Sequence, residues 1–260
     1  MKQQLIECVP NFSEGRDLTI IKQITNEIES VDGVKLLDVD PGAATNRTVV
    51  TFVGTPEAVM EAAYKAIVKA GEIIDMSKHK GEHARMGATD VCPLIPVANI
   101  SMEETSQWAV KLAKRVGETT HIPTYLYGAS QPNTKRNVLS IIRTGEYEGF
   151  FEKIKRPEWK PDFGPATYSA RSGATVIGAR DFLIAYNINL NTTSTRIANR
   201  IAFDVRETGR VVREGNPFTG KIKTDEHGEP VRIPGTCKAV QAVGWYIDEY
   251  KVAQVSANLT

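Results

Sequence analysis

The chain has 260 residues, of which 41% are hydrophobic and 24% charged, and its formal net charge is +1. This balance is typical of a globular protein and excludes disordered, collagen-like and coiled-coil chains. A nucleic-acid or membrane-surface partner would favour a basic excess, so we expect neither. At roughly 150 residues per domain, the length fits one large domain or two small ones.

The cysteine pattern and the first residues indicate the compartment. Cys8, Cys92 and Cys237 form no CxxC pair, so neither a zinc ribbon nor a disulfide scaffold is predicted. Free thiols are typical of a reducing compartment. Residues 1–7 lack the apolar core of a signal peptide, and no apolar run approaches the roughly 20 residues that span a bilayer. We therefore expect a cytoplasmic protein.

Alternating strands and helices are predicted for the first third of the chain. An apolar run at 5–9 predicts a strand that stops at Pro10, and helical spacing of apolar residues predicts a helix from Asp17. Strands are expected at 34–39 and 47–53. Thr55 and Pro56 then open a second helix as its N-cap and first helical residue. The order so far is β-α-β-β-α.

The middle of the chain is less regular. A polar stretch at 75–90 precedes a strand at 91–100, which Pro93 and Pro96 predict to be an edge or irregular strand. Ser101 and Glu104 form a capping-box pattern before a third helix. Another strand is expected at 122–128 and a short helix within 143–151.

A second series of elements follows a stretch rich in proline and glycine at 158–178, which we interpret as a linker between domains. A strand at 182–190 and a helix at 197–205 precede a polar surface hairpin or insertion at 214–235. Strands at 240–247 and 252–258 are joined by a tight turn. This order repeats the opening without its last helix and strand. It fits the ferredoxin-like β-α-β-β-α-β arrangement and also suits other α/β sandwiches.

Residues 76–87, here named the histidine loop, carry two His, two Lys, one Arg and one Glu. They form either a solvated polar loop or a catalytic loop, in which a His titrates near neutral pH and the cations attract an anionic substrate. His79 and His83 are four residues apart, but the order is not HExxH and Gly81 interrupts a helix between them. We therefore expect no metal site.

Other candidate residues stand beside strands and in a glycine-rich stretch. Asp38 and Asp40 share a face at the end of a strand, either as turn-capping carboxylates or as functional ones. Arg47, next to Asn46, either clamps a carboxylate bidentately or sits at a strand edge. Residues 163–174 either let a ligand approach the backbone closely or form a flexible linker. The sequence contains no GxGxxG, Walker A or GxSxG motif that would indicate a nucleotide fold or a serine hydrolase.

Longer runs of residues carry a family resemblance. They include ECVPNFSEG at 7–15 and IDMSKHKGEH at 74–83, and further runs at 37–40, 45–48, 85–88, 90–93, 125–128, 145–148, 161–165, 178–180, 244–246 and 253–256. Together they resemble glutamate formimidoyltransferase, which is also found as the amino-terminal part of formimidoyltransferase-cyclodeaminase. This resemblance covers the whole chain.

The resemblance implies an α+β fold of two ferredoxin-like (β-α-β-β-α-β) subdomains, residues 1–178 and 179–260. Family members continue with another helix and strand, so we expect the second subdomain to be incomplete. The implied activity is transfer of a formimino group from N-formimino-L-glutamate to N5 of tetrahydrofolate, in histidine degradation. Tetrahydrofolate is the co-substrate and no metal is needed. The family also implies a homodimer and, in some members, a cyclodeaminase partner.

The resemblance also implies residue roles. His83 is the catalytic base and Asp40 its acidic companion, while Arg47 and Asn46 remain candidates for substrate binding. The folate segment, residues 164–173, matches the folate-contacting part of the family and consists of Gly164, Pro165, Ala166, Thr167, Tyr168, Ser169, Ala170, Arg171, Ser172 and Gly173.

Two other functions stay open at this point. One is a related one-carbon reaction at the same folate site, either formyl transfer between glutamate and tetrahydrofolate or ring closure of 5-formyltetrahydrofolate. The other is a folate-binding homologue without catalysis, against which the retained His83 and Asp40 argue. We expect local positive charge for carboxylate-bearing ligands from Lys78, Lys80, Arg85 and Arg47.

Overall fold

The computed structural model describes residues 2–217 and 219–260. The chain divides between Asp181 and Phe182 into two compact units, each of which we describe by itself. Both units combine helices with largely antiparallel strands, which confirms the predicted α+β class. None of the helices in the described residues is long and apolar enough to cross a membrane.

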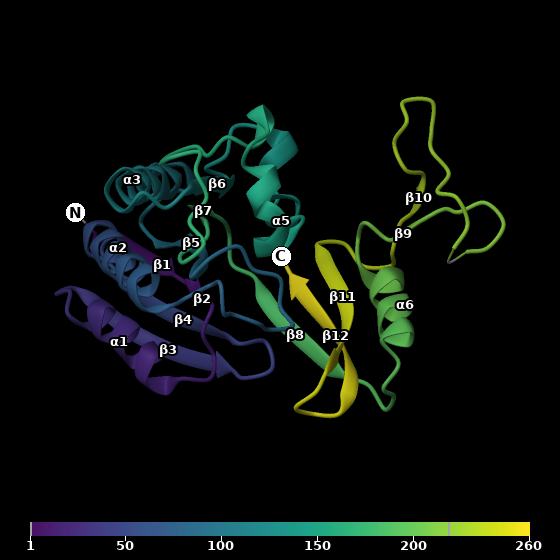
Figure 1. Cartoon of the computed structure of the whole chain (residues 1–260), viewed down its shortest axis with the longest axis horizontal. Coiled ribbons are helices and arrows are strands. Elements are labelled where there is room, and N and C mark those ends of the chain that lie inside the picture. The colour runs from purple at the N-terminus through teal and green to yellow at the C-terminus, as the bar shows by residue number, and fades with distance from the viewer. Residues whose placement is uncertain (1, 218) are drawn as a thin grey trace. The chain divides into compact units, whose positions relative to one another are not determined.

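The first unit is built on one sheet (Figure 1). In spatial order the strands are β3 (Val34–Gly42), β4 (Arg47–Gly54), the pair β1 (Leu5–Cys8) and β2 (Asn11–Phe12), β5 (Thr89–Ala98), β7 (Thr175–Ala179) and β6 (Thr124–Gly128). From β3 to β5 neighbouring strands are antiparallel, whereas β7 runs parallel to both β5 and β6. The antiparallel part has the ferredoxin-like strand order, and β7 and β6 widen the sheet.

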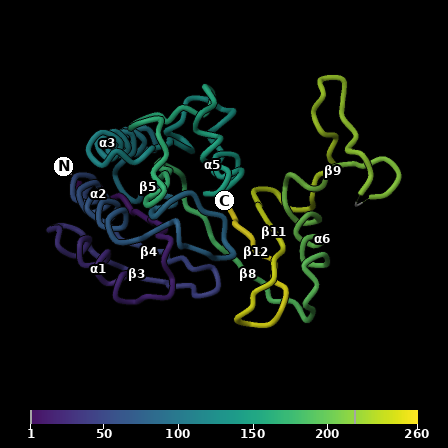
Figure 2. Tube along the Cα trace, in the orientation of Figure 1, coloured from purple at the N-terminus to yellow at the C-terminus, as the bar shows by residue number. Residues whose placement is uncertain are grey.

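Three long helices pack against this sheet: α1 (Leu18–Glu29), α2 (Pro56–Ile73) and α3 (Met102–Thr120). Figures 1 and 2 show α1 and α2 lying side by side. The predicted start signals are confirmed, because Thr55 accepts a hydrogen bond from Ala58 N, and Ser101 and Glu104 form the reciprocal capping box. These caps satisfy backbone N–H groups that have no partner within the helix.

The sheet of the first unit buries side chains on both faces near β5, β7 and β6. Leu94, Leu126 and Ile177 belong to the core beneath the three long helices. Tyr125 and Val176, which are their neighbours in sequence and so point the other way, pack in a second cluster. This second cluster includes side chains of the short helices α4 (Leu139–Arg143) and α5 (Glu146–Lys153), which are flanked by single 3-10 turns, η1 (Thr134–Arg136) and η2 (Pro157–Trp159).

Of the two alternatives predicted for the strand of Pro93 and Pro96, the irregular strand is confirmed by shifts of register against β1 and β2, and the edge strand is wrong. β5 pairs with β1 and β2 on one side and with β7 on the other. Pro93 lies opposite the break between β1 and β2, and Pro96 lies beyond Leu94, the last residue of β5 that β7 pairs. Both prolines therefore occupy positions where a missing N–H removes little of the ladder.

The interpretation of residues 158–178 as an interdomain linker is also wrong. β7 occupies the end of this stretch as a fully buried strand between β5 and β6. The prolines and glycines mark loops of the first unit, among them the folate segment. The stretch looked like a linker because β7 is short and follows directly after Gly173 and Ala174.

The second unit is smaller. β8 (Ile184–Asn189), β12 (Val252–Leu259) and β11 (Val240–Ile247) form an antiparallel sheet in the order β11-β12-β8. Helix α6 (Thr195–Val205) packs Ala198 and Ala202 onto β11 and β12. The predicted surface hairpin is confirmed as the exposed excursion that begins and ends with β9 (Arg210–Val211) and β10 (Arg232–Ile233).

Candidate functional site

Two segments that are distant in the sequence lie against each other in the first unit, namely the histidine loop and the folate segment. The backbone N–H of Met76 donates to the carbonyl of Arg171 at 2.9 Å, and that of Ala88 donates to the carbonyl of Ser172 at 2.9 Å. The fold therefore brings both ends of the histidine loop against the folate segment.

Two glycines make this close approach feasible. Gly87 and Gly173 form an isolated β-bridge. A Cβ on Gly87 would lie 2.2 Å from the carbonyl oxygen of Ala174, and one on Gly173 would lie 2.2 Å from that of Met86. Gly173 also has a φ of 65°, in the left-handed region that glycine adopts readily. Any side chain at either position would push the two segments apart.

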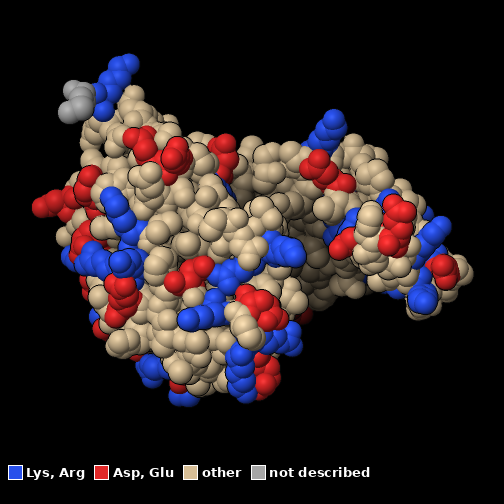
Figure 3. Space-filling model, turned by 90° about the horizontal axis from the view of Figure 1, so that it is seen from above, with Lys and Arg blue, Asp and Glu red and all other residues tan. Residues whose placement is uncertain are grey.

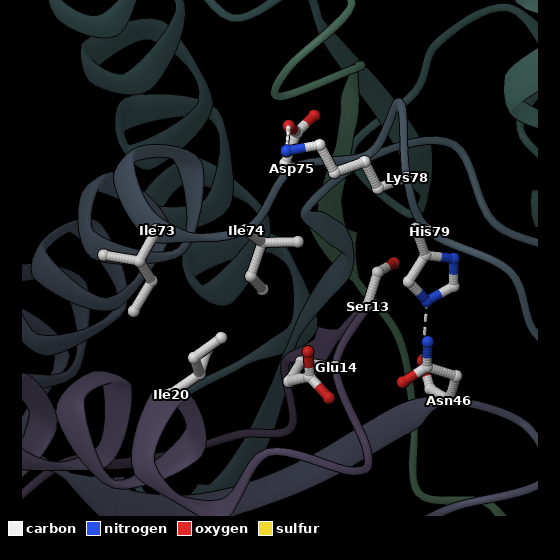
Figure 4. Close-up of a pocket in the computed structure, with 9 residues that line it drawn as sticks. All are labelled: Ser13, Glu14, Ile20, Asn46, Ile73, Ile74, Asp75, Lys78 and His79. Atoms are coloured by element: carbon white, nitrogen blue, oxygen red, sulfur yellow. Dashed lines mark hydrogen bonds and ion pairs between the residues drawn. The ribbon is translucent and has the colours of Figure 1, made fainter.

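Asn46 fixes the other side of the histidine loop. Its side-chain Oδ1 accepts from the N–H of Gly15 at 3.0 Å, and its Nδ2 donates to the carbonyl of Lys80 at 3.0 Å. The ring of His79 bonds through Nε2 to the backbone carbonyl of Asn46 at 2.8 Å, as Figure 4 shows. Nδ1 of His79 accepts from Nε of Arg85 at 3.3 Å, so the proton lies on Nε2. Burial lowers the pKa of His79, which keeps this tautomer neutral.

A pocket of about 240 Å³ lies beside His79 (Figure 4). Ile20, Ile73 and Ile74 form its apolar wall, and Asp75 and Lys78 stand at its polar side. The polar atoms of its other lining residues are largely used within the protein. These residues therefore hold the histidine loop in place, and the pocket offers few donors to a ligand.

His83 is held in one tautomer by its neighbour. Its Nδ1 lies 2.7 Å from the carbonyl oxygen of Ala84. A carbonyl only accepts hydrogen bonds, so Nδ1 carries the proton and Nε2 carries the lone pair. Nη1 of Arg47 lies 3.2 Å from the same Nδ1. Burial, followed by the charge of Arg47, lowers the pKa of His83 to about 4, so the imidazole is neutral at pH 7.

Asp90, at the start of β5, is completely buried, and its carboxylate binds the two arginines that surround His83. Its Oδ2 accepts from Nη1 of Arg47 at 2.5 Å and from Nη2 of Arg143, and its Oδ1 accepts from the N–H of Met86 at 3.0 Å. Burial raises the pKa of Asp90, but Arg143 and Arg47 outweigh this and hold the pKa below its usual range. The carboxylate is therefore ionised and organises both guanidinium groups.

The position of Arg143 depends on the end of α4. Nζ of Lys153 donates to the carbonyls of Ile141, Ile142 and Thr144 at 3.1, 2.7 and 3.0 Å. This buried ammonium satisfies the terminal carbonyls of the helix that carries Arg143. Burial lowers the pKa of Lys153 to about 8.

A second ion pair also ties this region to the histidine loop. Nη2 of Arg85 donates to Glu148 at 2.7 Å, and its Nη1 donates to Glu146 at 3.1 Å. Helix α5, which carries Glu148, is thereby linked to the loop that carries both candidate histidines.

The other predicted residues differ in exposure. Asp40 is exposed on β3, opposite Val49 of β4. In the folate segment Ser172 and Gly173 are buried, while the ring of Tyr168 packs against that of Phe151 with centroids 3.5 Å apart. The remaining members are exposed or half-buried: Gly164, Pro165, Ala166, Thr167, Ser169, Ala170 and Arg171.

Sequence reasoning missed Asp90 and Arg143 as site residues. Asp90 had a detectable signal, because it is the one acidic residue at the head of an otherwise apolar strand. Arg143 had none, since its role depends on the packing of α4 against Asp90, 53 residues away in sequence. Asn11 was also missed; its Oδ1 accepts from Nε of Arg47 at 2.8 Å.

Comparison with known proteins identifies the family of the chain. Residues 5–180 match the family model of the formiminotransferase domain, N-terminal subdomain, and residues 185–260 match that of the formiminotransferase domain. The chain belongs to the formiminotransferase domain family.

Three relatives show how the chain compares with named members. It is 48% identical to the glutamate formimidoyltransferase of Thermoplasma acidophilum and 36% identical to that of Streptococcus pyogenes, in each case over 98% of this chain and 77% of the relative. It is 50% identical to the formimidoyltransferase-cyclodeaminase of Gallus gallus, over 98% of this chain. The chain spans 44% of the length of that relative.

Potential metal ligands are not grouped in the parts of the chain that the structure describes, 2–217 and 219–260, where no cluster of three His, Cys, Asp or Glu side chains is found. On the face of the molecule shown in Figure 3, basic and acidic side chains are interspersed.

Proposed function

We propose that the chain transfers the formimino group of N-formimino-L-glutamate to N5 of tetrahydrofolate, with His83 as the general base, in histidine degradation. Family membership supports the reaction, and two of the relatives carry the name glutamate formimidoyltransferase. The observation that carries the proposal is the neutral imidazole of His83, which has its proton on Nδ1 and belongs to the loop that pairs with the folate segment through Gly87 and Gly173.

The proposed chemistry needs one group that moves a proton twice. The N5 lone pair attacks the formimino carbon and forms the new C–N bond, while the N5 proton passes to Nε2 of His83. The adduct then collapses, the C–N bond to glutamate breaks, and the glutamate nitrogen takes the proton from His83. Base assistance of this kind contributes about 10² to 10⁴-fold to the rate. A larger share is expected from holding both reactants in register.

The folate segment is proposed as the binding site for tetrahydrofolate. Its glycines Gly164 and Gly173 pack closely against neighbouring backbone and so fix the course of the segment, and the half-buried Tyr168 packs against Tyr147, over which Arg85 of the histidine loop lies. Asp40 is proposed as the acidic group that stabilises the cationic formimino carbon. The amide of Asn46 is already bonded to Gly15 and Lys80, so we propose that Asn46 contributes by positioning the loop.

The assembly and the compartment belong to the same proposal. We propose a homodimer in the cytoplasm, in which a cyclodeaminase receives the formimino-folate product. The name of the Gallus gallus relative, formimidoyltransferase-cyclodeaminase, supports the second activity as a partner. The free cysteines Cys8, Cys92 and Cys237 support a reducing compartment.

A donor comparison tests the proposed reaction. The protein is incubated with tetrahydrofolate and either N-formimino-L-glutamate or N-formyl-L-glutamate, and separately with 5-formyltetrahydrofolate alone, while the folate absorbance is followed. We expect turnover with the formimino donor. Turnover with the formyl donor alone, or ring closure of 5-formyltetrahydrofolate alone, would reassign the reaction. Folate binding without any turnover would indicate a non-catalytic homologue.

A further inference from the structure

Two guanidinium groups share one buried carboxylate next to His83. Asp90 is 0% exposed, and the side chains of Arg47 and Arg143 are 10% and 13% exposed. The group carries two positive charges and one negative charge, and His83 adds none while it is neutral. One positive charge is therefore uncompensated within a largely buried cluster, which favours the approach of an anion.

Both arginines keep donors that no protein atom uses. Arg47 donates through Nε to Asn11 and through Nη1 to Asp90 and the carbonyl of Ala84. Arg143 donates through Nε and Nη2 to Asp90. Within residues 2–217 and 219–260, Nη2 of Arg47 and Nη1 of Arg143 have no hydrogen-bond acceptor. Neither of these two nitrogens is fully buried, so both donors reach solvent.

The ligand that matches this arrangement is a carboxylate. Planar guanidinium groups bind carboxylates through paired N–H groups, and here the carboxylate of Asp90 already fixes the orientation of both forks. Because Asp90 occupies the inner donors, the outer donors are pre-organised, and a ligand binds without having to order two long side chains.

The distance to His83 assigns the carboxylate to one substrate. In N-formimino-L-glutamate the α-carboxylate is attached to the same carbon as the reacting nitrogen. In tetrahydrofolate the aminobenzoyl group separates the glutamate carboxylates from N5. Nη1 of Arg47 lies only 3.2 Å from the imidazole of His83, so a carboxylate on these arginines lies close to the reacting atoms.

We propose that Arg143 and Arg47, oriented by Asp90, form the subsite that binds the α-carboxylate of the glutamate-type donor. This inference rests on the proposed function. Arg47 and Arg143 contact the substrate, whereas Asp90 is a positioning residue. The subsite also explains why the chain keeps two buried arginines against one carboxylate, an arrangement that is costly without an anionic ligand.

The test measures the Michaelis constants of an Arg143→Gln variant. We expect its KM for N-formimino-L-glutamate to rise about 10- to 100-fold, because a charge-assisted pair is lost, while its KM for tetrahydrofolate changes by less than about twofold. Arg143→Lys keeps the charge but loses the fork, so we expect an intermediate KM. Arg115→Gln removes another partly buried arginine, paired with Glu61 between α3 and α2, and serves as the matched control. An unchanged donor KM in Arg143→Gln would overturn the subsite.

A binding measurement separates this inference from the proposed reaction. Wild type and Arg143→Gln are titrated with L-glutamate and with its α-amide by calorimetry. We expect wild type to prefer L-glutamate about tenfold or more and Arg143→Gln to lose that preference. This result in a protein that transfers no formimino group would reject the proposed function and keep the subsite. Equal affinity of wild type for both probes, or no binding of L-glutamate, would overturn the subsite even if transfer is observed.

Discussion

Nη1 of Arg47 lies 3.2 Å from Nδ1 of His83. Burial and this neighbouring cation lower the pKa of His83 to about 4, and the carbonyl of Ala84 keeps the proton on Nδ1. The same guanidinium is bound to Asp90, so the buried carboxylate and the imidazole are linked through a single arginine. The state of His83 is therefore set by residues of β4, β5 and α4 together.

The pH dependence of turnover is the first prediction. A general base acts in its neutral form, so kcat/KM for the donor should rise with pH through a limb near pH 4 and then remain level to neutral pH. A carboxylate bound at Arg47 and Arg143 offsets their charge, so the limb in kcat should lie at higher pH than the limb in kcat/KM. Steady-state kinetics from pH 3.5 to 8 measure both. Coincident limbs near pH 6.5 would show that His83 is not perturbed as described.

The stability of the protein should also depend on His83. Its folded-state pKa of about 4 lies below the unfolded value of about 6.5, so the unfolded state binds more protons between these values. The free energy of unfolding should therefore fall as pH is lowered from about 6.5 to 4. Urea unfolding of wild type and of His83→Gln at pH 7 and pH 4.5 tests this. The variant should lose less stability over this range, and equal losses would contradict the prediction.

Removing the charge of Asp90 should be strongly destabilising. Asp90→Asn leaves two buried guanidinium groups without their carboxylate, and breaking a buried pair costs about 3–5 kcal/mol. Glu61→Gln removes the charged partner of the more exposed Arg115 and should lower the free energy of unfolding by less than about 1 kcal/mol. Denaturant unfolding of both variants provides the comparison. Similar small losses in both would mean that the Asp90 cluster does not stabilise the fold.

Gly173 tests the contact between the histidine loop and the folate segment. Gly173→Ala places a Cβ 2.2 Å from the carbonyl oxygen of Met86 at a residue with positive φ. This should lower the free energy of unfolding by about 1–3 kcal/mol or more. Gly149→Ala is the matched control, because a Cβ there meets nothing within 4 Å and alanine favours helix α5 by up to about 1 kcal/mol. In thermal unfolding, we expect a lower midpoint for Gly173→Ala and an unchanged or higher midpoint for Gly149→Ala. A Gly173→Ala protein as stable as wild type would show that the two segments separate without cost.

Local sequence patterns predicted the parts of the fold that local physics determines. Helices α2 and α3 begin directly after their N-caps, Thr55 and Ser101, because the capping side chains satisfy backbone N–H groups within one turn. Strand β7 was missed, since its burial depends on β5 and β6 lying on either side of it. A short apolar run after a glycine does not reveal such neighbours.

The same distinction applies to the site. His83 and the folate segment were identified by resemblance, and in the structure the ends of the loop that carries His83 contact the folate segment. The role of Asp90 and Arg143 follows only from tertiary packing, because a lone acidic residue in a strand and an arginine at the end of a short helix are each unremarkable in sequence. Asn46 shows the reverse case: its side chain suited a ligand, but its amide is bonded to Gly15 and Lys80.

The most direct test of the account is the turnover of His83→Ala with tetrahydrofolate and N-formimino-L-glutamate, measured together with folate affinity. His227→Ala, in the exposed hairpin of the second unit, is the control. We predict that His83→Ala loses at least about 100-fold in kcat and binds folate within about twofold of wild type, whereas His227→Ala keeps both values. Near-normal turnover by His83→Ala would contradict the central claim that His83 moves the proton.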